Sequence, residues 1–229
     1  MNEGKVIVIS GGSDGVGKAV ARKLASNNKV IILARGEEKL KKVSEEIGSD
    51  FRVCDISDYN QCENVMKSII DAYGQIEVLV NNAGVWIEGE LKDNDPEKIL
   101  RVVNINTIGT INLTRTTIPF MIEKKSGSII NIISLAGVSS KTGRTVYSAS
   151  KWAITGFTKS LSKELAPQGI KVTGIYPGYM TTNLFEEYGD DRDKEKSLDL
   201  EEVADTIEFI LSRSDKTHIL SVELKNVDY

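Results

Sequence analysis

Histidine is almost absent from this chain of 229 residues, in which His218 is the only one. A single histidine near the C-terminus excludes a Ser-His-Asp triad and a histidine-rich metal site. We therefore expect no metal centre. Any proton transfer near neutral pH must use another type of side chain, with a pKa shifted by its surroundings.

Cysteine is also scarce. The sequence contains only Cys54 and Cys62, and they do not form a C-x-x-C pair. Two thiols are too few for a disulfide framework, so we expect both to be free and buried or half-buried.

Long apolar runs are missing as well. The first residues carry no apolar signal core, and no later run reaches the ~20 residues needed to cross a bilayer. The net charge of −4 is modestly acidic, whereas proteins that bind nucleic-acid phosphates usually present a basic face. These features predict a cytoplasmic protein with no nucleic-acid and no membrane partner.

Short apolar runs alternate with longer amphipathic stretches along the whole chain. The runs are almost continuously hydrophobic, which is typical of parallel strands covered on both faces. We expect a doubly wound α/β protein with about seven strands, helices on both faces of the sheet and one domain over residues 1–229. The predicted strands are Val6–Ile9, Val30–Leu33, Phe51–Cys54, Val78–Val80, Ile129–Ile133, Val172–Ile175 and Ile219–Leu224; the predicted helices are 15–27, 37–47, 58–73, 96–124, 147–166 and 201–212.

One segment departs from this composition. Residues 183–199 are rich in charge and have almost no apolar anchors. They follow a predicted strand end, where ligands bind in such sheets. The segment is interpreted either as a solvated surface loop or as a lid over a binding site.

A glycine-rich turn joins the first predicted strand to the first predicted helix. The sequence from Ser10 to Gly17 reads S-G-G-S-D-G-V-G. Free N–H groups at a helix N-terminus can bind a pyrophosphate, and glycines let the backbone approach it closely. The turn predicts a dinucleotide site.

Three further residues form a candidate catalytic group. Tyr147 and Lys151 are four residues apart and share one face of a predicted helix. An ammonium near a phenol favours the phenolate, which brings a tyrosine closer to useful acid-base chemistry at neutral pH. Ser134 ends a predicted strand and is expected to project toward the same place, where its hydroxyl can hydrogen-bond a substrate oxygen.

These motifs, in this order, resemble those of the short-chain dehydrogenase/reductase family. The G-x-x-x-G-x-G spacing, an N-N-A-G segment at Asn81–Gly84, the Ser134, Tyr147 and Lys151 group and a P-G-x-x-x-T segment at 177–182 carry the resemblance, which covers about residues 4–212. The resemblance implies a Rossmann-type fold and an NAD(P)-dependent oxidoreductase. It implies a cofactor site made by Gly11, Ser13, Asp14, Gly15, Val16, Gly17, Arg35, Asp55, Asn82, Ala83, Gly84, Tyr147, Lys151, Pro177, Gly178 and Thr182.

Asn106 is the fourth catalytic candidate that the resemblance implies, as part of a water-linked proton path from the lysine. Asn104 lies two residues away, and the N-x-x-G spacing favours Asn106. In the P-G-x-x-x-T segment, Thr182 matches the spacing and Thr181 is the neighbouring alternative. Trp86, Val138, Tyr179 and Phe185 are candidates for the substrate pocket or for packing.

The second predicted strand ends at Leu33-Ala34-Arg35, with no carboxylate to hold a ribose 2′-hydroxyl. Arg35 can instead pair with a 2′-phosphate through its planar fork, so we expect NADP(H) rather than NAD(H). Asp14 stands where many NADP(H)-using relatives carry a basic residue, and Glu37 and Glu38 follow Arg35. The alternative is a solvated arginine.

The predicted reaction is reversible hydride transfer between NADP(H) and a small ketone or secondary alcohol, with Tyr147 as general acid and base. A catalytically silent nucleotide-sensing regulatory protein of the same fold is the alternative. A sugar-nucleotide epimerase usually needs a larger substrate domain than this chain provides.

The chain lacks the Gly-Gly segment with which many relatives end, in the region that helps them build a tetramer; we expect a homo-oligomer, either a dimer or a tetramer.

Overall fold

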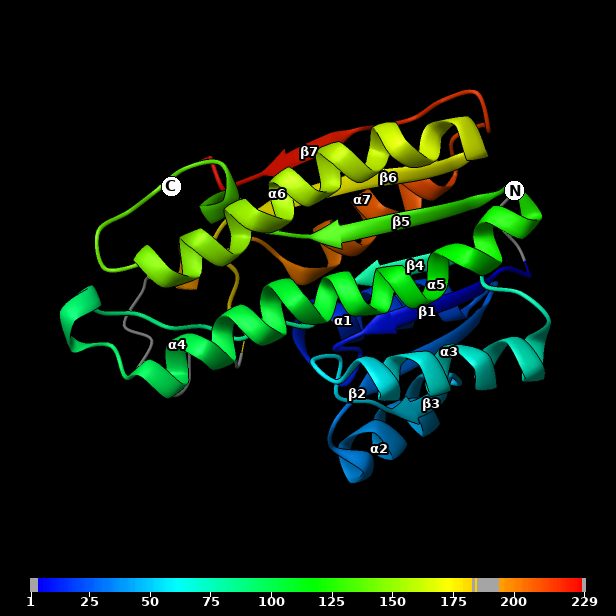
Figure 1. Ribbon diagram of the computed structural model, residues 1–229, viewed down its shortest axis with the longest axis horizontal. Helices are drawn as coiled ribbons and strands as arrows, with labels where there is room; N and C mark the ends of the chain where they lie inside the picture. Colours follow the sequence, from blue (N-terminus) through cyan, green and yellow to red (C-terminus); the bar gives the residue numbers. More distant parts are fainter. Residues whose placement is uncertain (1–3, 183, 185–193, 228–229) are drawn as a thin grey trace.

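A computed structural model of the protein describes residues 4–182, 184 and 194–227. Seven parallel strands form one sheet in the order β3-β2-β1-β4-β5-β6-β7 (Figure 1). This is the doubly wound, Rossmann-type arrangement that the alternating pattern predicts. The strands are β1 (Val6–Ser10), β2 (Lys29–Ala34), β3 (Asp50–Val53), β4 (Val78–Asn81), β5 (Gly127–Ile132), β6 (Ile170–Pro177) and β7 (Ser221–Leu224).

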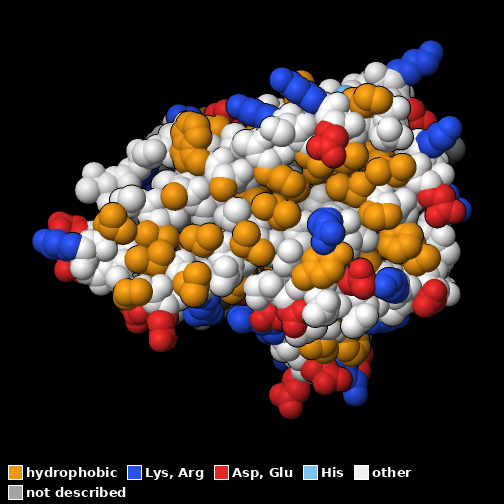
Figure 2. Space-filling model, in the orientation of Figure 1, with side chains coloured by type: hydrophobic (Ala, Val, Ile, Leu, Met, Phe, Trp, Pro, Cys, Tyr) orange, Lys and Arg blue, Asp and Glu red, His pale blue; other side chains and the backbone are white. Residues whose placement is uncertain are grey.

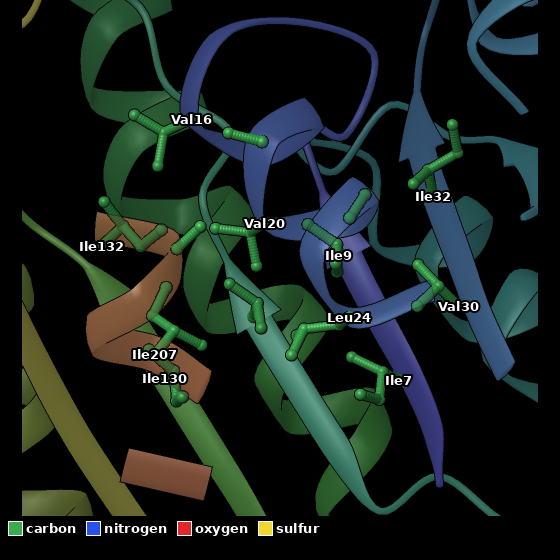
Figure 3. Close-up of a cluster of buried hydrophobic side chains, with 14 of the residues drawn as sticks. Ile7, Ile9, Val16, Val20, Leu24, Val30, Ile32, Ile130, Ile132 and Ile207 are labelled. Atoms are coloured by element: carbon green, nitrogen blue, oxygen red, sulfur yellow. The ribbon is translucent and has the colours of Figure 1, made fainter. Parts of the chain in front are cut away.

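Helices cover both faces of the sheet. Successive side chains of a strand point to opposite faces, so Ile7 and Ile9 of β1 pack on one side and Val8 on the other. The first side holds α1, α2 and α7, and the second holds α3, α5 and α6. Figure 3 shows side chains of α1 and α7 packed on the first side. The helices are α1 (Gly15–Ala25), α2 (Glu37–Ile47), α3 (Tyr59–Tyr73), α4 (Pro96–Val103), α5 (Thr110–Lys124), α6 (Thr145–Leu165) and α7 (Leu200–Leu211).

The predicted helix at 96–124 is confirmed, but its middle is of a different helical type. The chain is helical throughout this range, but residues Asn104–Gly109 between α4 and α5 form a π-helical segment. The Asn106 side chain bonds to the backbone of Val85, and Gly109 lies against Ile56, whose Cγ1 would be 2.6 Å from an added Cβ. These long-range contacts fix the wider turn, and no local sequence period reports them.

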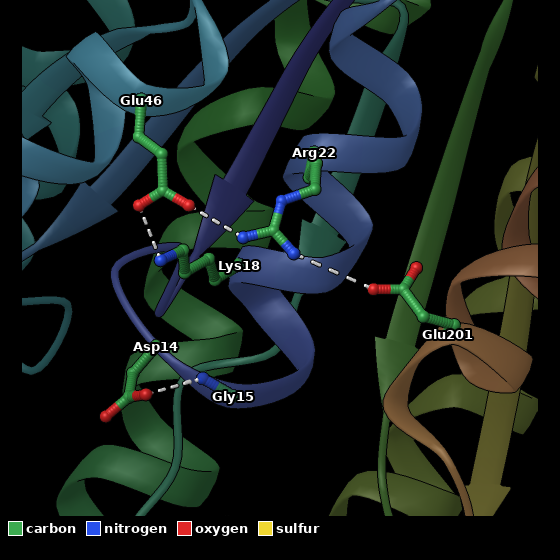
Figure 4. A network of polar contacts seen from close by, with 6 residues as sticks. All are labelled: Asp14, Gly15, Lys18, Arg22, Glu46 and Glu201. Atoms are coloured by element: carbon green, nitrogen blue, oxygen red, sulfur yellow. Dashed lines mark hydrogen bonds and ion pairs between the residues drawn. The ribbon is translucent and has the colours of Figure 1, made fainter.

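The first helix is held at both ends by polar contacts (Figure 4). Asp14 caps α1, because its carboxylate accepts a hydrogen bond of 2.8 Å from the Gly15 N–H. Farther along α1, Lys18 and Arg22 both pair with Glu46 of α2 at 2.7 Å, and Arg22 also lies 3.8 Å from Glu201 of α7. Exposed pairs of this kind add little stability, but they join three helices on one face.

Two other expectations can be compared with the structure. Both cysteines are free and buried, as predicted. Within the described ranges, no helix is both long and apolar enough to cross a membrane. Of the proposed lid at 183–199, residues 183 and 185–193, and with them the pocket candidate Phe185, lie outside the described residues.

The order of the strands places a binding site. Chain connections leave the centre of the sheet in opposite directions from β1 and β4, which lie side by side. In open parallel sheets, ligands bind at such a switch point, beyond the carboxyl ends of the strands.

Candidate active site

A cleft of about 600 Å³ opens at the carboxyl ends of β1, β4, β5 and β6. Its volume is in the range usual for small-molecule and cofactor sites. Most of the predicted site residues line it. From the predicted set these are Gly11, Ser13, Asp14, Gly15, Val16, Arg35, Asp55, Asn82, Ala83, Gly84, Ser134, Tyr147, Lys151, Pro177, Gly178 and Thr182.

Gly17 is the predicted cofactor residue that does not line the cleft. A Cβ at Gly17 would lie 2.2 Å from the Gly11 carbonyl oxygen, so this glycine lets α1 pack onto the turn. Gly11 has a φ of +67°, and its Cβ would lie 2.8 Å from Asn82 Nδ2. The two glycines therefore make a tight turn whose backbone faces the cleft, which is the cradle that a dinucleotide pyrophosphate requires.

Two cations line the far end of the cleft. Arg35 follows β2 and is exposed, and Lys39 of α2 lines the same wall. Lys39 Nζ lies 2.6 Å from Asp14 Oδ2. The negative charge of Asp14, which would repel a 2′-phosphate, is therefore paired with a cation. The sequence did not indicate Lys39, because only the crossover from β2 to α2 brings it to Asp14.

Ser134 follows β5 in an unusual backbone conformation. Its φ of +140° is rare for a residue with a side chain, and such a conformation costs on the order of 1–3 kcal/mol. The Ser134 Oγ accepts a hydrogen bond of 3.1 Å from the Ala136 N–H. Since its oxygen is the acceptor there, the hydroxyl hydrogen is left to donate toward the cleft.

Tyr147 and Lys151 lie on the wall that α6 contributes. The Tyr147 ring packs against the Trp86 ring with 4.2 Å between centroids, and it is 5 % exposed. The Lys151 Nζ lies 5.6 Å from the centre of the Tyr147 ring and 3.5 Å from the Ile132 carbonyl oxygen. The structure thus places Ser134, Tyr147 and Lys151 around one cleft.

Burial changes the chemistry of the lysine. Removal of Lys151 from water lowers its pKa from 10.5 to about 8, because a low-dielectric site disfavours the charged form. Lys151 is 6 % exposed, and Gly84 lies beside it, where an added Cβ would be in ordinary contact with the Lys151 Nζ at 3.6 Å. The amine is therefore held in a narrow, mostly dry position at the base of the cleft.

Asn106 lies behind the cleft and is not among the residues that line it. Its Oδ1 accepts from the Val85 N–H at 2.8 Å, and its Nδ2 donates to the Val85 carbonyl at 2.9 Å and to Ser150 Oγ at 3.1 Å. Its backbone carbonyl accepts from Thr110 Oγ1 at 3.0 Å. The side chain thus ties the segment after β4 to α6, which makes Asn106 a positioning residue by its contacts.

The structure distinguishes between residues that were alternative candidates for lining the cleft. Thr182 lines the cleft, whereas Thr181 does not. Trp86 and Tyr179 line it, whereas Val138 packs in a small core cluster with Ile133 and Ile154.

Sequence reasoning missed a group of basic residues at the substrate end. Two come from α4 and two from the segment that enters α6. Each of these four residues is an isolated cation in a polar segment of the sequence, so no motif indicated a role for it. They are Lys98, Arg101, Lys141 and Arg144, and all four line the cleft.

The fold and the site define a dinucleotide-binding α/β oxidoreductase. Comparisons with known proteins identify the family: a family model described as short chain dehydrogenase matches residues 5–193. The chain belongs to the short-chain dehydrogenase/reductase family, whose members are oxidoreductases.

Relatives and solved structures agree with this assignment. The chain is 36 % identical to carbonyl reductase family member 4 of Xenopus laevis over 228 residues, which cover 96 % of each chain. It is similar to a structure of a metagenomic short-chain oxidoreductase in complex with NADP, with a TM-score of 0.85, 31 % identity and coverage of 97 % and 96 %. It is also similar to a variant of the actinorhodin polyketide ketoreductase with NADPH, with a TM-score of 0.90, 28 % identity and coverage of 99 % and 97 %.

Proposed function

We propose that this protein transfers a hydride between NADP(H) and the carbon of a small ketone or secondary alcohol, with Tyr147 as general acid and base. The observation that carries the proposal is the placement of Ser134, Tyr147 and Lys151 around one cleft whose other end is a glycine cradle. The names of the carbonyl reductase and ketoreductase relatives support a carbonyl substrate.

Each residue has a separate task in this reaction. The nicotinamide cofactor, when bound, supplies or accepts the hydride. Ser134 donates a hydrogen bond to the substrate oxygen, on which charge develops. Tyr147 gives a proton to that oxygen in reduction and removes it in oxidation. Lys151 as an ammonium favours the phenolate, and Asn106 holds the backbone that faces the lysine.

The reaction class is tested with a panel of ketones and secondary alcohols, followed by the absorbance of NADPH. Turnover of at least one member supports the proposal. Tight NADPH binding without any turnover would favour the silent regulatory protein instead.

NADP(H) preference is part of the proposal, and Arg35 is its main support. Arg35→Gln removes the planar cation next to the expected 2′-phosphate. We expect kcat/KM for NADPH to fall roughly 10- to 100-fold, because a charge-assisted hydrogen bond contributes about 1.5–3 kcal/mol. The value for NADH should stay nearly constant.

Lys42→Gln is the matched control for this comparison. Lys42 is exposed on α2 and does not line the cleft, so its loss should leave the NADPH to NADH ratio unchanged. A wild-type enzyme that prefers NADH would contradict the assignment.

The cytoplasmic location and the homo-oligomer remain predictions. Figure 2 shows apolar side chains gathered across the face that α4, α5 and α6 present. The exposed large apolar residues of α4, α6 and the π-helical segment include Leu100, Ile108 and Trp152, which are 60 %, 41 % and 48 % exposed. We expect a second copy to cover such a face; sedimentation of a dimer or tetramer would support this, and a monomer at all concentrations would contradict it.

A further inference from the structure

Several positive charges reach the cleft from α4 and from the segment that enters α6. Four basic side chains line it, namely Lys98 and Arg101 of α4 and Lys141 and Arg144 of the segment that enters α6. In the described part of the chain, the carboxylates that line the cleft are Asp14 and Asp55, which belong to the cofactor half. A cleft lined by one sign of charge concentrates ligands of the opposite sign.

Arg144 is the least exposed of these cations. Its side chain is 18 % exposed. The guanidinium lies 5.1 Å from the centre of the Trp86 ring, and the Trp86 ring in turn packs on Tyr147 with 4.2 Å between centroids. These two ring contacts place the guanidinium one aromatic ring away from the phenol.

The orientation of Arg144 leaves donors for a ligand. Its Nε lies 3.6 Å from Glu88 Oε1, and Trp86 Nε1 donates to Glu88 Oε2 at 3.4 Å. Glu88 therefore holds one edge of the guanidinium. Within the described residues the two terminal nitrogens have no hydrogen-bond partner, and a guanidinium fork matches a carboxylate or phosphate.

A second polar group, at the start of α6, also lines the cleft. Ser148 follows Arg144 by four residues, so both lie on one face of the helical turn. Ser148 lines the cleft and is 6 % exposed, and its hydroxyl has no hydrogen-bond partner in the described residues. A buried polar group of this kind usually pairs when its ligand is present.

We infer that the substrate is an anionic carbonyl compound, whose carboxylate or phosphate binds Arg144 while its carbonyl oxygen lies between Ser134 and Tyr147. This inference rests on the proposed carbonyl reduction. Because Arg144 and Tyr147 contact the same Trp86 ring, we expect the anionic group to lie only a few bonds from the carbonyl. Arg101, which also lines the cleft, adds to the positive potential that attracts such a substrate.

Paired substrates test the inference through turnover. Acetoacetate is compared with methyl acetoacetate, and dihydroxyacetone phosphate with dihydroxyacetone, because each pair differs in the anionic charge. We expect the anionic member of at least one pair to have the higher kcat/KM, and Arg144→Gln to lower the anionic-to-neutral ratio roughly 10- to 100-fold. Which pair responds distinguishes a carboxylate from a phosphate.

Arg213→Gln is the control. Arg213 also stacks on an aromatic ring, that of Phe209 at 4.2 Å, and it does not line the cleft. This variant should keep the wild-type ratio. Equal or better turnover of both neutral members, or an equal loss of both activities in Arg144→Gln, would overturn the inference and leave the carbonyl reductase activity standing.

Binding provides a test that does not depend on turnover. The chain has two tryptophans, so Trp152→Phe leaves Trp86 as the single reporter beside Arg144. With NADP+ bound, acetoacetate or inorganic phosphate should change the Trp86 emission saturably, and Arg144→Gln should abolish the change. Saturable binding without turnover of any carbonyl compound would refute the proposed function alone; no saturable change with either anion would refute the anion site.

Discussion

Tyr147→Phe should lower kcat by roughly 10²- to 10⁴-fold, the usual contribution of a general acid or base, while NADPH binding stays close to that of the wild type. Phenylalanine keeps the ring that packs on Trp86 at 4.2 Å and removes only the hydroxyl. The cofactor cradle, formed by the glycine turn and the ends of β4 and β6, is untouched by this change. A loss confined to kcat would therefore report on proton transfer rather than on folding.

Tyr176→Phe is the matched control. Tyr176 lies on β6 beside α6, is 2 % exposed and does not line the cleft. Burial raises the pKa of its phenol, which makes it a weaker candidate for a base at neutral pH. We expect this variant to retain kcat. Activity near the wild-type level in Tyr147→Phe would remove the central element of the mechanism.

The part of the site that follows strand ends could be predicted from the sequence. Ser134 follows β5, the glycine turn follows β1 and Asn82 follows β4, and the carboxyl ends of parallel strands meet at one edge of a sheet. Tyr147 and Lys151 required only the helical period. Because these rules are local, the order of strands was enough to bring the residues together.

The rest of the site depends on contacts between distant elements. Lys39 reaches Asp14 through the packing of α2 on α1, and the π-helical turn at Asn106 follows from bonds to Val85 and Ser150. Arg144 gains its position from Trp86, which is 58 residues away in the chain. No periodicity or spacing contains this information, so the sequence predicted the catalytic group but not the charge of the substrate pocket.

Replacement of Lys151 by methionine should separate activity from stability. Below about pH 8 the wild-type lysine is charged in both the folded and the unfolded chain, and the folded state bears the cost of holding that charge out of water. Methionine has a similar volume and no charge. We expect turnover to be lost, because the ammonium beside Tyr147 is gone. The protein without cofactor should become more stable near pH 7 by up to roughly 3.5 kcal/mol, because the pKa is lowered from 10.5 to about 8 and each pKa unit corresponds to about 1.4 kcal/mol.

The pH dependence of this difference identifies its cause. Because the pKa of Lys151 is lowered in the folded state, the unfolded chain binds more protons between about pH 8 and pH 10.5, and the wild type gains stability as the pH rises through this window. The advantage of Lys151→Met in urea melts should therefore shrink from pH 7 toward pH 10. Lys159→Met, on the exposed side of α6, should alter neither stability nor turnover appreciably. A Lys151→Met protein that is less stable than the wild type at pH 7, or equally active, would show that burial of this amine is not what sets the chemistry of the site.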